Sequence, residues 1–211
     1  MSLSLIGSTS VAASSVTIPT HQVGDLIVIW AQNKDIFTRP TKPTASGTVP
    51  AFVDISAATG TGCRTAYFVA TATNTTSGTW TNATGMIVTV IRGADATTPI
   101  GSFLQAGGTS ASGSTAPAVT PTVADGSSFI LEFYAHRNNT LWSSAPAGYT
   151  RRATTNTQGC FNTKDVTTTA PSIFQGASVS GSGSYRGETI EIIAGSGTPP
   201  PTVNSNFLAF M

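Results

Sequence analysis

The chain has 211 residues, of which only 9% are charged, and its formal net charge is +1. No basic or acidic tract occurs, so neither a nucleic-acid partner nor a solvating tail is expected. No segment approaches the ~20 consecutive apolar residues that span a bilayer, so we expect no membrane insertion. Residues 1–15 lack the positive segment and long apolar core of a signal peptide, and none is predicted.

Short segments rich in β-branched or aromatic residues recur along the chain between Gly, Pro, Asn and Ser, whereas helical periodicity is nearly absent. The strands predicted in chain order are 15–19, 25–32, 51–57, 63–71, 78–82, 86–93, 128–136, 149–154, 172–180 and 188–195. Their spacing is typical of an all-β, antiparallel β-sandwich or jelly roll. One sandwich domain is expected over 1–197, with an extended arm over 198–211.

The first strongly apolar strand contains six consecutive apolar residues, from Leu26 to Ala31. Such a run indicates a strand that is buried on both faces. Segments 86–93 and 128–136 are nearly as continuous. In a two-layer sandwich only the inner faces are covered by the opposite sheet, so a loop, the arm or another chain must cover the outer ones. We expect a homo-oligomer, with a trimer as the working number; the alternative is a loop over the strand end.

Two similar segments indicate an internal duplication. Pro19-Thr20 precedes Gly24, and Pro121-Thr122 precedes Gly126 at the same offset, and each segment then enters a very apolar strand. The halves would span about 1–106 and 118–197, joined by a Gly/Ser-rich segment over 107–119. Chance similarity between β-rich segments is the alternative.

The last residues of the sequence combine a stiff spacer with an apolar cluster. Pro199–Pro201 favours an extended polyproline conformation that cannot continue a central strand. Beyond it, Phe207, Leu208 and Phe210 are candidate assembly contacts on a neighbouring subunit. The alternative is that the arm folds back onto its own sandwich.

Catalytic and metal-binding patterns are weak. His21 and His136 are the only histidines, and no G-x-S-x-G elbow or clustered metal ligands occur. Glu188 and Glu191 are three residues apart and should point to opposite faces of a strand. Glu132 with Glu191 is the one carboxylate pair considered for glycoside hydrolysis. The prediction is a non-enzymatic protein without cofactor or metal.

The two cysteines, Cys63 and Cys160, lie far apart and neither has a CxxC neighbour. We expect two free, buried thiols, with a disulfide as the alternative.

Two loops rich in hydrogen-bonding groups follow the most apolar strands, at 33–43 and 136–150. Aromatic faces flanked by amide and guanidinium groups suit a glycan. The candidate contacts are Phe37, Arg39, Asn138, Trp142 and Tyr149. The alternative is that the three aromatic rings plug the ends of the sandwich.

Several segments carry a resemblance: "GDLIVIWA" at 24–31, "CRTAYFVAT" at 63–71, "MIVTVIRGADATTPI" at 86–100 and "NSNFLAF" at 204–210. A G-D-L strand, an aromatic–Ala strand and an R-G-x-D turn followed by Pro99 resemble small β-rich virion accessory proteins of tailed bacteriophages and prophages. The family includes head decoration and tail appendage types, and no catalytic residue carries over.

This resemblance implies a virion structural protein made in the bacterial host cytoplasm. Its partners would be copies of itself and other virion proteins, such as the major capsid or tail proteins. The alternative function is a tail-tip or fibre module that binds a host surface glycan, and the third is a glycan-degrading enzyme.

Overall fold

The computed structural model describes residues 2–35, 37–56, 62–71, 76–123, 125–155, 158–167 and 170–196. These residues form strands and no helix, which confirms the predicted all-β class. Accordingly, no helix that could cross a membrane occurs among them. The strands are β1 Ser4–Val11, β2 Leu26–Gln32, β3 Val53–Asp54, β4 Cys63–Val69, β5 Gly85–Arg92, β6 Ile100–Ser110, β7 Gly113–Ala116, β8 Ser128–His136, β9 Asn139–Trp142, β10 Thr150–Thr155, β11 Gly159–Thr167, β12 Ile173–Val179 and β13 Gly183–Ile192.

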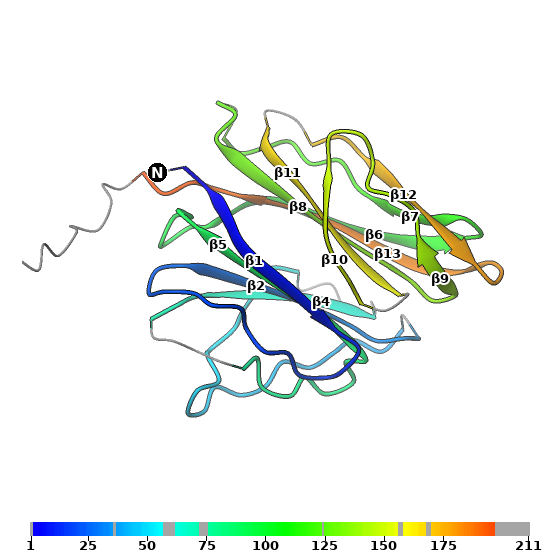
Figure 1. The fold of residues 1–211 in the computed structure, drawn as a ribbon, viewed down its shortest axis with the longest axis horizontal. Helices are drawn as coiled ribbons and strands as arrows, with labels where there is room; N and C mark the ends of the chain where they lie inside the picture. The colour runs from blue at the N-terminus through cyan, green and yellow to red at the C-terminus, as the bar shows by residue number, and fades with distance from the viewer. Residues whose placement is uncertain are drawn as a thin grey trace, which may run out of the picture.

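The strands form two five-stranded sheets and one three-stranded sheet, all paired antiparallel (Figure 1). The first sheet has the order β1-β5-β2-β4-β3, the second β10-β11-β8-β13-β6, and the small sheet β7-β12-β9. The antiparallel sandwich is therefore confirmed. The jelly-roll alternative is not, because the first five strands all lie in one sheet.

The second large sheet repeats the strand order of the first. Strands β6, β13, β8, β11 and β10 occupy the places of β1, β5, β2, β4 and β3. Gly24 and Gly126 precede the two central strands with φ of 89° and 84°, a backbone conformation that favours glycine. The sheets divide between β5 and β6, which is earlier than the expected joint at 107–119, because β6 pairs with β13 along most of its length.

The main core lies between the two large sheets. The ring of Trp30 on β2 stacks on Phe133 of β8 at 5.5 Å between centroids, and Phe133 stacks on Phe161 at 4.6 Å. The buried residues of this core are Leu26, Val28, Trp30, Ile55, Cys63, Ile87, Ile91, Phe129, Leu131, Phe133, Ala135, Phe161, Ile190 and Ile192. Half of these residues come from the first sheet and the residue after β3, and half come from the second sheet. Each sheet therefore needs the other to bury its inner face.

The outer face of the first sheet is covered by loops of the same chain. Val16 and Ile18 from the segment after β1, Phe52 before β3 and Trp80 before β5 pack on the outward side chains of the sheet. Every residue of β2 is buried as a result. The predicted two-sided burial of this strand is confirmed, and its cover is intramolecular.

The outer face of the second sheet is covered by the small sheet. Tyr134 on β8 and Cys160 on β11 pack against Ala116 of β7 and Trp142 of β9. Figure 1 shows β7, β9 and β12 gathered over one end of the second sheet. The surplus apolar area that motivated the expected oligomer is thus largely covered within one chain.

Two predicted strands are loops, and five strands were not predicted: β1, β6, β7, β9 and β11. Segments 15–19 and 78–82 make only isolated bridges, yet they bury Val16, Ile18 and Trp80. Conversely, β1 and β6 are rich in Gly, Ser and Thr and lie at sheet edges. Pairing with β5 and β13 sets their conformation more than their own apolar pattern does. Residues 197–211, with Phe207, Leu208 and Phe210, lie outside the described residues.

Candidate functional site

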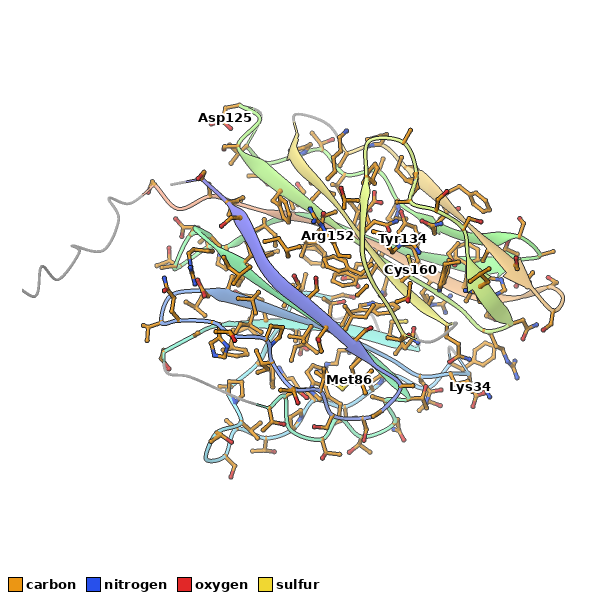
Figure 2. The ribbon with its side chains drawn as sticks, in the orientation of Figure 1. Lys34, Met86, Asp125, Tyr134, Arg152 and Cys160 are labelled. Atoms are coloured by element: carbon orange, nitrogen blue, oxygen red, sulfur yellow. The ribbon has the colours of Figure 1, made fainter. Side chains whose placement is uncertain are left out.

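The two loops expected to bind a ligand meet at one end of the sandwich. The first follows β2 and carries Phe37, and the second begins with Arg137 directly after β8. The Arg137 guanidinium lies 5.6 Å from the centroid of the Phe37 ring, within the range of a cation–π contact. The Phe37 side chain is exposed, with 56% of its surface accessible. Figure 2 marks this end of the molecule by Lys34.

The turn after β8 is held firmly by hydrogen bonds. The N–H of Arg137 donates to the carbonyl of Ser184 at 2.9 Å, and the N–H of Asn138 donates to Nδ1 of His136 at 3.2 Å. The side-chain amide of Asn138 donates to the Ser182 carbonyl at 2.9 Å. Asn138 therefore lies at the predicted end, with its NH₂ group engaged in shaping the turn.

Arg39 anchors its own loop. Its guanidinium donates to the carbonyl of Ser56, and burial together with the nearby charge of Arg64 lowers the pKa of Arg39. Beside it, Arg64 makes a bidentate contact to Asp54 with both distances at 2.7 Å, and Lys42 lies 3.1 Å from the same carboxylate. These charges form a compact cluster along β3 and β4 that ties the loop to the sheet.

Trp142 is not an exposed stacking platform. Only 6% of its surface is accessible, and its ring lies 6.3 Å from that of Tyr134, between the small sheet and the second sheet. Tyr149 is half-buried, with Nζ of Lys164 at 5.7 Å from its ring centroid. Trp142 is thus a buried packing residue and not an exposed ligand contact. Of the aromatic rings among the expected contacts, Phe37 is the exposed one. Its partner Arg137 was not among the residues predicted from the sequence. The position of Arg137 immediately after β8 was the feature that could have indicated it.

Glu132 lies fully buried on the outer face of β8, beneath the small sheet. Burial raises its pKa to about 7, against the opposing effects of the Tyr134 and Tyr149 hydroxyls. Tyr134 donates a hydrogen bond to Oε2 of Glu132. The carboxyl group of Glu132 is therefore surrounded by packed side chains of the same protein chain.

Glu188 and Glu191 point to opposite faces of β13, as predicted. Glu188 faces the main core, where Thr65 of the opposite sheet donates to it and burial raises its pKa to about 7. Glu191 accepts hydrogen bonds from the N–H groups of Ser102 and Thr122 at 2.9 and 2.6 Å. Burial alone would raise the pKa of Glu191, but hydrogen bonds to its carboxylate lower it overall. Both groups tie elements together.

Both cysteines are free and buried, which confirms the expectation. Burial raises the pKa of Cys160 to about 12 and that of Cys63 further still. Among the described residues, no three His, Cys, Asp or Glu side chains are grouped so that they could hold a metal ion.

The motifs that carry the family resemblance meet in space. Asp25, at the start of the G-D-L strand, is 1% exposed and accepts two hydrogen bonds from Arg92, both at 2.9 Å. Arg92 opens the R-G-x-D turn, and the next residue, Gly93, has a φ of 83°. Asp25 also accepts from the N–H of Gln22 at 2.9 Å. The two motifs therefore form one structural lock at the end of β2 and β5.

The comparisons with known proteins add no relative: no protein-family model, no curated protein and no solved structure matches the chain.

Proposed function

We propose that this protein is a non-enzymatic structural component on the exterior of a tailed-bacteriophage particle, as a capsid decoration protein or a tail appendage. The observation that carries the proposal is the lock between Asp25 and Arg92. It joins the G-D-L strand to the R-G-x-D turn, so the residues behind the resemblance act as one unit of the fold. In this role the protein is made in the host cytoplasm and contacts capsid or tail proteins and copies of itself.

The distribution of charge supports a structural role. Asp25 and Glu191 each accept several hydrogen bonds from their own chain, and Glu188 bridges the two sheets. Such ties suit a small, rigid module, because a buried polar group is costly unless it is hydrogen-bonded. The outer faces of both large sheets are also largely covered by the same chain.

The copy number in purified particles tests this function. Particles are purified from infected cells by density gradient, and the protein is quantified by mass spectrometry against the major capsid protein. Hundreds of copies per particle would place it on the head, and a few to tens on the tail. Expression in infected cells without any co-purification would refute the virion role.

Attachment to a host surface glycan is a second candidate function, favoured by the exposed Phe37 ring beside Arg137. An aromatic face next to a cation and amide groups offers stacking and hydrogen bonding to a sugar. Phe37→Ala should reduce binding of the protein to host cells at least tenfold with an unchanged melting temperature. Phe174→Ala is a matched control, since Phe174 is 51% exposed on the small sheet. Equal binding by the two variants would rule out the Phe37 surface.

A further inference from the structure

One edge of the sandwich opens into a groove. Near the end of β1, Oγ of Ser10 donates to the Thr154 carbonyl of β10 at 2.6 Å, so the two sheets are closed together there. Toward the start of β1 a groove of about 670 Å³ is lined by Leu3 just before β1, Leu5 of β1, Phe129 of β8 and Arg152 of β10. Figure 2 labels Arg152, and also Asp125, which precedes β8. The volume is in the range of ordinary ligand sites.

The groove exposes the margin of the main core. Phe129 belongs to that core, and Leu5 of the edge strand packs against it together with the preceding Leu3. The rim is polar, with Ser2, Ser4 and Ser127 and the charged Asp125 and Arg152. An occupant should therefore present apolar side chains to the floor and amide or hydroxyl groups to the rim.

The free edge of β1 favours an extended peptide as the occupant. In the described part of the chain β1 pairs with β5 alone, so it is the terminal strand of its sheet. The backbone groups on its other side are available to a further strand, and strand addition is a common mode of peptide recognition.

We propose that residues 203–211 of the same chain occupy this groove. The chain leaves the described structure beside it. The N–H of Gly195 donates to the carbonyl of Gly93 at 2.8 Å, and the backbone of Ser2, which lines the groove, leaves no room for a Cβ at Gly93. The six residues 197–202 span up to roughly 20 Å when extended, at ~3.3 Å per residue.

The sequence of the segment matches the groove. Asn204, Ser205 and Asn206 supply amide and hydroxyl groups for the rim, and the apolar cluster follows immediately. In an extended strand Leu208 and Phe210 lie on the same face and point to the floor together.

Seating in the same chain is favoured over seating in a second copy. A short tether gives the segment an effective concentration near the millimolar range, far above the micromolar concentration of a purified protein. The segment would enter the groove of a second copy only in an array that holds that groove as close as the groove of its own chain. The inference does not depend on the virion role.

Cysteine pairs in the full-length protein test the proposal. The test variant carries Ser4→Cys on the groove rim and Ala209→Cys in the segment. The control carries Ser112→Cys with Ala209→Cys. Ser112 lies in the turn after β6, near His136 at the opposite end of β8, since Nε2 of His136 is 3.1 Å from the carbonyl oxygen of Ser110. Both native thiols are buried and should not interfere.

Mild oxidation should link the groove pair within one chain at least ten times faster than the control pair, as read by peptide mass spectrometry. Adding Leu208→Asn and Phe210→Asn should reduce the groove rate to that of the control. Equal rates for the two pairs would overturn the proposal. Disulfide-linked dimers in place of linked monomers would overturn it too, because they would assign the groove to a second copy.

Discussion

Replacing Glu132 by Gln should stabilise the protein above neutral pH. Glu132 is fully buried between β8 and the small sheet, and Tyr134 donates to its Oε2 atom. Gln keeps the shape of the side chain and an oxygen that accepts from Tyr134, and it removes the ionisation. The variant therefore isolates the cost of holding a charge at this position.

The pKa of Glu132 gives the magnitude and the pH range. Burial raises it from the ordinary 4.5 to about 7 in the folded protein. Between these values the folded state binds more protons than the unfolded state, so stability falls as pH rises from 4.5 to 7. At about 1.4 kcal/mol per pKa unit the loss approaches about 3 kcal/mol. Wild type and Glu132→Gln should be equally stable near pH 4, with the variant about 2–3 kcal/mol more stable at pH 8.

Urea denaturation followed by tryptophan fluorescence at pH 4, 6 and 8 measures the difference. Glu191→Gln is the matched control, because hydrogen bonds lower the pKa of Glu191 despite its burial. Its charged form stabilises the fold above the ordinary pKa, and that contribution is lost as pH falls through the folded value. Glu191→Gln should therefore lose stability at pH 8. If Glu132→Gln also loses stability at pH 8, the charge at Glu132 is favourable and the reasoning is refuted.

Three further changes test the packing. Trp142→Ala should cost ~3–5 kcal/mol in urea denaturation, since it empties the space between the small sheet and β8; a loss below 1 kcal/mol would contradict the buried ring. Arg92→Ala leaves Asp25 buried without its guanidinium and should cost about 1–3 kcal/mol, because Arg92 itself is partly exposed; adding Asp25→Asn should recover part of the loss, and strict additivity in the double-mutant cycle would exclude the lock. Cys63 and Cys160 should resist a thiol reagent at pH 8 in the native state and react fully in urea, because burial raises both pKa values; rapid native labelling would show the burial to be wrong.

The sequence predicts what depends on local pattern. The continuous apolar run from Leu26 to Ala31 indicated burial on two faces, and β2 is buried throughout. Local sequence patterns could not identify the residues that cover β2, because Val16 and Trp80 lie in loops whose β-bridges are to distant parts of the chain. Trp142 was misplaced for a similar reason. Its strand β9 exists only by pairing with β12, more than thirty residues later, so a polar loop composition concealed a buried ring.

The two large sheets correspond in their cores and differ on their outer faces. Leu26 pairs with Ile91 as Phe129 pairs with Ile192, and all four side chains lie in the main core. By this register Trp30 is the equivalent of Phe133, and the two rings stack on each other across the main core.

The same register makes Ser128 the equivalent of Asp25, with one additional residue after Gly126 compared with Gly24. Ser128 donates to Glu191 on β13, the strand that corresponds to β5, at 2.6 Å. In both sheets a side-chain hydrogen bond therefore joins the central strand to its neighbouring strand. The carboxylate lies just before the central strand in the first sheet and on the neighbouring strand in the second. On the outer faces the change is larger. Where the first sheet has Ile29 under loops, the second has Glu132 under the small sheet β7-β12-β9. The repeated part of the fold maintains the shared core, so the parts unique to one half, the small sheet and the loops, are where a specific role can evolve without disturbing that core.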